Sequence, residues 1–295
     1  MTQYINKEIY MYQLWDINEI KFILKKHGFS FSKALGQNFI IDASVCPAIA
    51  EQAGVNREDY VLEIGPGIGV FTAELCARAK KVVAVELDKR LPDILADTLA
   101  DFDNFELVEG DFLKLDLERF FAEHFSGAQS IKVCANLPYY ITSPVIMTLL
   151  QSGLPIQSIT VMVQKEAGER LCAPVGSKQA GAVTAAVNYY AEAQEAFFVP
   201  KQSFMPAPKV DSEVIHLFVR TQPPVQVEDE ALFFKVVKAA FLQRRKAAAN
   251  SLSAGLGMPK AEVIEMLEEL GFAPGIRAES FTMEDFARIT NYLHK

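Results

Sequence analysis

The chain has 295 residues, half of them hydrophobic, and a net charge of −8. This length allows one large domain and a small one, no apolar run approaches the roughly 18 residues of a membrane span, and the N-terminus lacks the features of a signal peptide. The four cysteines are too scattered for a zinc site or a disulfide framework, so we expect no metal and a cytoplasmic location. The length suggests a monomer, and the net negative charge, taken alone, argues against a nucleic-acid partner.

The first predicted element is a helix near the N-terminus. Asp16 and Glu19 have the spacing of a capping box, and Gly28 can end the helix. Its apolar stripe consists of Ile17, Ile20 and Leu24. A glycine-containing loop, FSKALGQNFIID, follows at residues 31–42, and a second helix is predicted after Asp42.

From Tyr60 a pattern of strand, turn and helix repeats. Short apolar runs predict buried strands at 60–64, 82–87, 105–110, 131–136 and 158–164, with helices to about Arg78 and across 89–100. Strands that alternate with helices form a parallel sheet with helices on both faces. The sequence therefore predicts an α/β fold.

After residue 183 the pattern changes. Residues 185–199 and 212–220 read as two strands without a long helix between them, which predicts a terminal antiparallel pair on the sheet. Residues 221–230 read as a linker, and four helical segments follow near 231–243, 246–254, 259–270 and 282–293. We expect an N-terminal helix and loop (1–42), an α/β domain (43–222) and a helical C-terminal domain (223–295).

Three successive strand ends carry polar or glycine residues. Gly65-Pro66-Gly67-Ile68-Gly69 has the spacing G-x-G-x-G rather than the dinucleotide fingerprint, and Pro66 removes a donor that a phosphate would use, so a nucleoside fits better. Glu86, 21 residues after Gly65, is placed to bind ribose hydroxyls. Asp111 is placed to accept from an exocyclic amine or, equally, to cap the helix that follows it.

This series resembles the Rossmann-like class I methyltransferases, which use S-adenosylmethionine. The fourth strand end, Asn136-Leu137-Pro138-Tyr139, matches the [DNS]-[IL]-P-[YF] pattern of enzymes that methylate nucleobase amino groups. The adenine amino nitrogen is a poor nucleophile because its lone pair is delocalised. The Asn136 amide and the Leu137 carbonyl can accept its two hydrogens, Pro138 can stiffen the loop, and Tyr139 can stack on an extruded base. The alternative is an ordinary turn with packing aromatics.

The resemblance narrows with four segments taken in order. Residues 33–42, 63–69, 136–139 and 204–212 together resemble the KsgA-type ribosomal RNA adenine dimethyltransferases. That resemblance implies cofactor contacts at Asn38, Ile40, Gly65, Glu86, Asp111 and Asn136, and a target adenine held between Tyr139 and Phe204. It implies transfer of two methyl groups to each of two adjacent adenines near the 3′ end of 16S rRNA, with small-subunit rRNA or an assembling subunit as partner.

Three other functions stay open. The first is a large-subunit rRNA methyltransferase of the erythromycin-resistance type, and the second is a non-catalytic RNA-binding or assembly relative. A nicotinamide-dependent oxidoreductase is disfavoured by the glycine spacing. One departure from the family is Lys246-Ala247-Ala248-Ala249-Asn250, where the family has bulkier residues, so the RNA contact of the helical domain is in question.

The charge is unevenly distributed. Residues 231–261 carry +6 and no acid, so the remaining residues carry −14, and residues 20–41 also lack acids. If residues 231–246 form one helix, one stripe of that helix gathers several basic residues. These are Lys235, Lys238, Arg245 and Lys246, and with Lys33 we expect them to bind RNA. Arg244 falls on the apolar side and is expected to pair with an acid. Solvated helix faces are the alternative.

Overall fold

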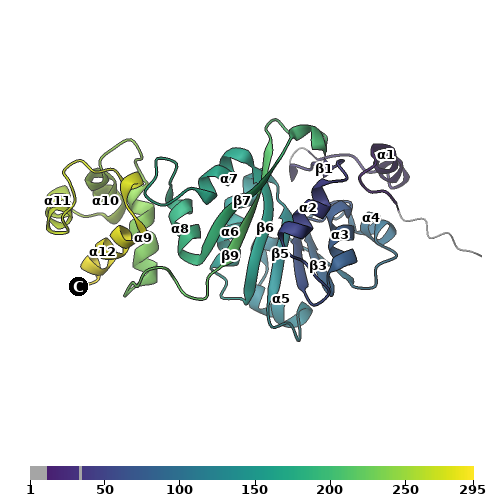
Figure 1. Ribbon diagram of the computed structural model, residues 1–295, viewed down its shortest axis with the longest axis horizontal. Helices are drawn as coiled ribbons and strands as arrows, with labels where there is room; N and C mark the ends of the chain where they lie inside the picture. Colours follow the sequence, from purple (N-terminus) through teal and green to yellow (C-terminus); the bar gives the residue numbers. More distant parts are fainter. Residues whose placement is uncertain (1–11, 33–34) are drawn as a thin grey trace, which may run out of the picture.

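The computed structural model describes residues 12–32 and 35–295 (Figure 1). No helix among these residues is long and apolar enough to span a membrane. The helices are α1 (Ile17–Lys26), α2 (Val45–Gln52), α3 (Val70–Arg78), α4 (Pro92–Thr98), α5 (Leu117–His124), α6 (Thr142–Leu150), α7 (Lys165–Cys172), α8 (Ala182–Tyr190), α9 (Glu230–Ala240), α10 (Ala248–Leu256), α11 (Lys260–Glu269) and α12 (Met283–His294). The strands are β1 (Phe39–Ile40), β2 (Tyr60–Ile64), β3 (Lys81–Glu86), β4 (Phe105–Glu109), β5 (Ile131–Asn136), β6 (Ile156–Gln164), β7 (Ala191–Val199), β8 (Phe204–Met205) and β9 (Ser212–Val219).

Seven strands form one sheet in the order β4-β3-β2-β5-β6-β9-β7. The first five are parallel, and β9 runs antiparallel to both β6 and β7. The order reverses between β2 and β5, and such a switch point is where open α/β sheets bind ligands, beyond the carboxyl ends of the strands. The predicted α/β fold and its terminal antiparallel pair are confirmed.

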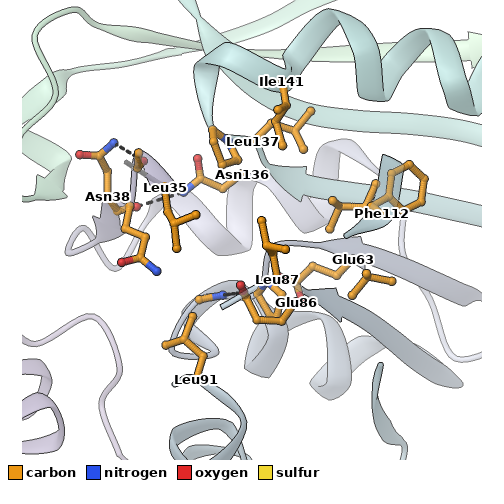
Figure 2. A pocket seen from close by; sticks show the side chains of 18 of the residues that line it. Leu35, Asn38, Glu63, Glu86, Leu87, Leu91, Phe112, Asn136, Leu137 and Ile141 are labelled. Atoms are coloured by element: carbon orange, nitrogen blue, oxygen red, sulfur yellow. Dashed lines mark hydrogen bonds between the residues drawn. The ribbon is translucent and has the colours of Figure 1, made fainter. Parts of the chain in front are cut away.

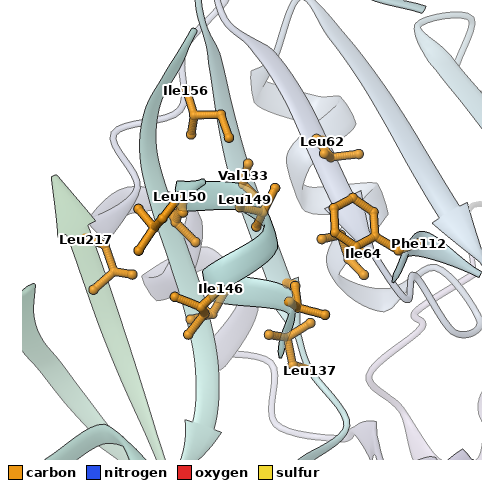
Figure 3. Packing of buried hydrophobic residues seen from close by; sticks show 14 of the residues in the cluster. Leu62, Ile64, Phe112, Val133, Leu137, Ile146, Leu149, Leu150, Ile156 and Leu217 are labelled. Carbon is orange, nitrogen blue, oxygen red and sulfur yellow. The ribbon is translucent and has the colours of Figure 1, made fainter. Parts of the chain in front are cut away.

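Apolar side chains on alternate positions cover both faces of the sheet. On one face Leu62 and Val133 pack against Ile146 and Leu149 of α6 (Figure 3). On the other face Val61 packs with residues of α2 and α3. Because both faces are covered, the strands are nearly continuous apolar runs, and their polar residues stand out at the carboxyl ends.

Helices α9 to α12 gather at one end of the molecule, away from β2 to β5 (Figure 1). They share a buried cluster of their own, which includes Phe233, Phe281 and Phe286. Tyr189 of α8 also belongs to this cluster, so α8 connects the helical group to the sheet.

Three sequence predictions are wrong in this region. Residues 182–190 form helix α8 rather than the first half of a strand, because alanines favour a helix and the Thr184 hydroxyl accepts from the Gly181 N–H at 3.0 Å, at the start of the helix. Helix α9 ends at Ala240, so residues 231–246 are not one helix. Arg244 then donates to the carbonyls of Lys178 and Ala180, at 3.1 and 3.2 Å, and not to an acid.

The predicted N-terminal helix is confirmed, with one change. The Asp16 carboxylate accepts from the N–H groups of Asn18 and Glu19, as a helix cap does. Ile20 and Leu24 are buried as expected, but Ile17 is exposed and Ile23 takes its place in the core. Helix α4 is shorter than the predicted span of 89–100.

The contact between α9 and α10 generates a prediction about stability. A Cβ added at Gly255 of α10 meets the Cβ of Ala239 on α9 at 2.4 Å. We expect Gly255→Ala to lower the free energy of unfolding, because overpacking costs about 1–3 kcal/mol and exceeds the gain of up to about 1 kcal/mol in helix propensity. Denaturant unfolding measures this. Gly181→Ala is the control, since a Cβ there meets nothing within 4 Å; a Gly255→Ala variant as stable as the parent would contradict the packing.

Candidate active site

A cavity of about 370 Å³ lies at the carboxyl ends of β2, β3, β4 and β5 (Figure 2). The structure brings together there every cofactor and catalytic residue expected from the sequence. They are Asn38, Ile40, Gly65, Glu86, Asp111, Asn136, Leu137, Pro138, Tyr139 and Phe204. These residues come from the ends of four strands and the segments that follow them, from β1 and the loop before it, and from β8. These segments are far apart in the sequence.

The glycine loop between β2 and α3 forms the floor of the cavity. Gly65, Gly67 and Gly69 have φ angles of 74°, 60° and 92°, a region that residues with a Cβ rarely adopt. A Cβ at Gly67 meets the Phe39 ring at 3.1 Å, whereas a Cβ at Gly65 meets nothing within 4 Å. The loop therefore packs closely under β1 at Gly67 and leaves room for a ligand at Gly65.

Glu86 presents a nearly buried carboxylate to the cavity. Its Oε1 accepts from the Asp88 N–H at 2.8 Å, and its Oε2 accepts from the Gly67 N–H at 3.4 Å. Burial raises the pKa of Glu86, while these backbone hydrogen bonds oppose the rise. Each oxygen still has lone pairs, so the carboxylate can accept from two ribose hydroxyls.

Asp111 and Phe112 follow β4 at the next strand end. The Asp111 Oδ1 accepts from the Leu113 N–H at 3.2 Å, and Oδ2 lies 3.0 Å from the Lys114 ammonium. Asp111 therefore caps only the short 3-10 helix Phe112–Lys114, whereas Asp116 caps α5, and the Asp111 side chain also lines the cavity. Phe112 is buried in the core below, where its ring can support one face of a bound base.

Hydrogen bonds among Gln37, Asp88 and Arg90 hold the loop before β1 over the cavity. The sequence had not indicated a role for these three residues. Gln37 Nε2 donates to Asp88 Oδ2 at 2.7 Å, and Gln37 Oε1 accepts from the Ser32 N–H at 3.0 Å. Arg90 donates to both Asp88 oxygens, at 2.8 and 2.6 Å, and to the Ser30 carbonyl at 3.1 Å. The Arg90 hydrogen bonds keep the pKa of Asp88 below its ordinary value. The only sequence signal was the position of Asp88, two residues beyond Glu86.

The same loop joins the two halves of the cavity. Strand β1 pairs antiparallel with β8, so Phe39 lies opposite Met205 and Ile40 opposite Phe204. The pairing continues where Ile41 N–H donates to the Ser203 carbonyl at 2.8 Å. On the other side the Asn136 amide Nδ2 donates to the Asn38 carbonyl at 3.3 Å (Figure 2). The loop therefore contacts both the end of β5 and the segment that carries Phe204.

Asn136 is the last residue of β5, and Leu137, Pro138 and Tyr139 form the turn that follows it. The Asn136 Nδ2 is used by Asn38, which orients the amide so that Oδ1 is the acceptor left for a ligand. The Tyr139 hydroxyl is 2.9 Å from Ser212 Oγ, which fixes the direction of the ring. Burial raises the pKa of Tyr139, so the phenol stays neutral. Tyr139 and Phe204 line the same cavity, and Tyr140 points outward, 59% exposed.

The basic residues expected to bind RNA lie apart from the cavity. Lys235 and Lys238 are exposed on α9, and Arg245 and Lys246 are exposed in the turn that follows it. Lys33 lies outside the described residues. Because α9 ends at Ala240, these side chains do not share one helical stripe, although they remain close in sequence.

The residues that the structure describes contain no cluster of side chains that could bind a metal ion. No group of three histidine, cysteine, aspartate or glutamate side chains there has the spacing to hold a metal ion. The four cysteines are free thiols, and three of them are buried.

Comparison with known proteins identifies one family. The family model "Ribosomal RNA adenine dimethylase" matches residues 28–295. A protein of Geobacillus thermodenitrificans named ribosomal RNA small subunit methyltransferase A is 49% identical over 276 residues, covering 92% of this chain and 94% of that protein. One of the same name from Bacillus mycoides is 46% identical over 283 residues, covering 94% of this chain and 97% of the other.

Two solved structures share the fold. The dimethyladenosine transferase of Plasmodium falciparum superposes with a TM-score of 0.71 at 23% identity, covering 86% of this chain and 97% of the other. The 23S rRNA methyltransferase ErmE superposes with a TM-score of 0.66 at 26% identity, covering 87% of this chain and 100% of the other.

The hydrogen bonds of Gln37 generate a prediction about ligand binding. Gln37→Leu keeps the size of the side chain but removes its bond to the Asp88 carboxylate. Since a hydrogen bond to a charged group is worth about 1.5–3 kcal/mol, we expect the affinity for S-adenosylhomocysteine to fall about tenfold or more, because the loop is released from the cavity. Isothermal titration calorimetry measures this affinity.

The matched control for Gln37 is Asn104→Leu. Asn104 is also a partly buried amide, and it donates to the carbonyls of Cys76 and Ala79 away from the cavity. That variant is expected to lose stability and to keep its affinity. Equal affinity losses in the two variants would mean that Gln37 acts only through general stability.

Proposed function

Because the chain belongs to the ribosomal RNA adenine dimethylase family, we propose that it transfers methyl groups from S-adenosylmethionine to the N6 amino groups of two adjacent adenines near the 3′ end of small-subunit rRNA. One observation carries the proposal: Asn136 to Tyr139, the expected base-binding turn, share one cavity with the glycine loop, Glu86 and Asp111. The proposed partner is small-subunit rRNA or an assembling subunit in the cytoplasm, and the proposed state is a monomer.

The cavity residues fit S-adenosylmethionine. Glu86 would accept from the ribose, Asp111 would accept from the adenine amine beside Phe112, and Gly65, Asn38 and Ile40 would hold the amino acid part; all of these residues line the cavity. The open space at Gly65, where even an added Cβ meets nothing, is consistent with close approach of a ligand. When bound, this cofactor supplies an electrophilic methyl group on a positively charged sulfur.

Asn136 and Leu137 prepare the target nitrogen. The Asn136 Oδ1 and the Leu137 carbonyl accept the two hydrogens of the adenine amino group, which draws the lone pair out of the ring and onto the nitrogen. This interaction strengthens as the nitrogen becomes pyramidal, so it favours the transition state over the ground state. Neither an amide nor a carbonyl is a base at neutral pH, so the proton that the methylated nitrogen releases goes to water.

Tyr139 and Phe204 hold the extruded adenine. Their rings line the cavity from the turn after β5 and from β8, and stacking on such rings stabilises a base by about 1–3 kcal/mol. Ser212 fixes the Tyr139 ring by its hydrogen bond, and the β1–β8 pairing fixes the backbone at Phe204. The turn that leads into Tyr139 is stiffened by Pro138, which lies under Gly36 of the covering loop.

A second candidate is methylation of large-subunit RNA. The fold similarity to the 23S rRNA methyltransferase ErmE supports this candidate, but the sequence identity is only 26%. Relatives at 46–49% identity carry the small-subunit name, and they match more than nine-tenths of this chain. The small-subunit RNA is therefore the proposed substrate, and we assign α9 to α12 to a separate C-terminal domain that contacts it.

The function is tested with labelled methyl groups. Purified protein is incubated with labelled S-adenosylmethionine and either small subunits or large-subunit rRNA. Both substrates come from a strain whose ribosomal RNA lacks these adenine methylations. We expect label in the small-subunit RNA, as N6,N6-dimethyladenine at two adjacent positions. Label in the large-subunit RNA alone would support the second candidate, and no label in either would support a non-catalytic relative.

Asn136 provides a sharper test of the chemistry. We expect Asn136→Ala to lower the methylation rate by about 100-fold or more, because it removes an acceptor that acts in the transition state. Cofactor affinity should fall only a few-fold, since one neutral hydrogen bond is worth about 0.5–1.5 kcal/mol. Single-turnover kinetics and calorimetry separate the two effects. Asn136→Asp, which keeps an acceptor oxygen, should retain more activity than Asn136→Ala; equal losses of rate and affinity in Asn136→Ala would make Asn136 a cofactor residue only.

The role of the basic residues near α9 is tested by measuring the affinity for RNA at several salt concentrations. Each phosphate contact that is lost should reduce the slope of log affinity against log salt by about 0.7–0.9. We expect lower slopes for two double variants, Lys235→Gln with Lys238→Gln and Arg245→Gln with Lys246→Gln. The control is Arg57→Gln with Lys80→Gln, two exposed residues before β2 and β3, at the sheet edge opposite the cavity. Slopes equal to the control would show that these side chains form only a solvated surface.

A further inference from the structure

Phe198 is an exposed aromatic side chain that neither the core nor the proposed mechanism uses. It lies near the end of β7, an edge strand of the sheet, and 49% of its surface is exposed. Its neighbour Phe197 packs against the buried cluster that contains Val214, so the two adjacent aromatic rings have opposite environments. Single exposed phenylalanines are common on protein surfaces, so the surroundings of Phe198 decide whether it has a role.

A β-bulge orients the Phe198 ring. The pairing of β7 with β9 shifts by one residue between Glu195 and Phe197. Without this shift Phe198 would stand opposite Ser212, whereas with the shift it stands opposite Glu213. Residues directly opposite each other share a face of the sheet, so the bulge turns Phe198 to the face on which α7 packs. Bulges are frequent beside active sites, where they re-aim a side chain.

Two lysines lie close to Phe198. The Lys165 ammonium, at the start of α7, is 5.7 Å from the centre of the Phe198 ring and 3.8 Å from the Glu169 carboxylate, near the outer limit of an ion pair. Lys201 follows Phe198 by three residues and is exposed, and residues 196–210 contain two lysines and no acid. We call Lys165, Phe198 and Lys201 the edge surface. Proteins bind single-stranded nucleic acid with such sets, because the ring stacks on a base while the cations contact phosphates.

The edge surface borders the residues expected to hold the target base. The Asp211 carbonyl accepts from the Lys165 N–H at 3.1 Å, and the Asp211 carboxylate accepts from the Lys201 N–H at 2.9 Å. Ser212, the next residue, lies 2.9 Å from the Tyr139 hydroxyl. Because a target adenine stays joined to its strand, the nucleotides next to it must cross the rim of the cavity beside Tyr139.

We propose that the edge surface binds the RNA strand next to the target adenine, with Phe198 stacked on a neighbouring base and the two lysines on phosphates. This inference rests on the proposed function and names the surface that holds the substrate beside the cavity. A protein segment would require a wider apolar patch, whereas here one ring stands with two cations. The basic residues near α9 lie apart from the cavity, so their contacts with RNA would be additional.

Phe198→Ala tests the stacking. The probe is the small subunit from a strain whose ribosomal RNA lacks these adenine methylations. We expect the affinity to fall about tenfold or more, because one base loses its aromatic partner, while the slope of log affinity against log salt stays the same, because no charge is lost. Phe198→Trp should bind like the parent protein. The matched control is Phe218→Ala, since Phe218 is 46% exposed near the other end of β9, away from the cavity, and this variant should also bind like the parent.

The two lysines are tested together. Lys165→Gln with Lys201→Gln should reduce the salt slope by about 0.7 for each of two phosphate contacts, about 1.4 in all. The control is again Arg57→Gln with Lys80→Gln, which should leave the slope unchanged. At saturating small subunits the methylation rate of Phe198→Ala should equal that of the parent, because Phe198 does not touch the reacting atoms.

Calorimetry with S-adenosylhomocysteine shows whether each variant is folded, since none of these changes lies in the cofactor site. If Phe198→Ala does not fold, Phe198→Leu replaces it, because leucine keeps an apolar side chain without a ring.

Two results would overturn the proposal. The variants without the Phe198 ring could bind small subunits as tightly as Phe218→Ala does, or the lysine variant could show the same slope as its control. Both results leave the proposed function intact, since the parent protein would still methylate the small-subunit RNA. Failure of the parent itself to methylate that RNA would contradict the proposed function, and this proposal with it.

Discussion

The two-residue pairing of Phe39–Ile40 with Phe204–Met205 is the contact on which the whole site depends. Four parallel strands deliver their polar ends to one edge of the sheet, but that edge alone is an open crevice. The pairing closes it, because the loop before β1 then lies between the end of β5 and the segment of Phe204. The Asn136 amide bonds to the Asn38 carbonyl on one side of that loop, and Gln37 bonds to Asp88 on the other. Cofactor residues and base-binding residues consequently share one wall, which couples their positions.

Burial at this edge determines the charges as well as the shape. Glu63 and Glu86 are adjacent acids in a site with few partners, and desolvation raises the pKa of both. Asp88 lies only a few residues away, yet the Arg90 guanidinium keeps its pKa low. Asp88 thus stays charged and holds the loop through Gln37, whereas burial favours the neutral forms of Glu63 and Glu86. A nucleoside with one charged end suits such a site better than a polyphosphate.

Much of this arrangement follows from the sequence. Apolar runs ending in Gly65, Glu86, Asp111 and Asn136 predicted both the parallel sheet and the edge that carries the site, because a buried strand leaves only its ends for polar residues. Two-residue strands such as β1 and β8 have no periodicity to detect, so only family resemblance placed Phe204 near Tyr139. Helix α8 was missed because its apolar residues were read as a strand, although its alanines and the Thr184–Gly181 hydrogen bond favour a helix. The end of α9 at Ala240 was missed too, and Arg244 beyond it donates to the carbonyls of Lys178 and Ala180.

A crystal structure with S-adenosylhomocysteine and adenosine bound would test the central claim, that one cavity holds both cofactor and target base, most directly. The account predicts the cofactor ribose within about 3 Å of the Glu86 carboxylate and the adenosine amino group within the same distance of Asn136 Oδ1, with its base between Tyr139 and Phe204. Adenosine bound elsewhere, or a cofactor whose ribose does not contact Glu86, would contradict it.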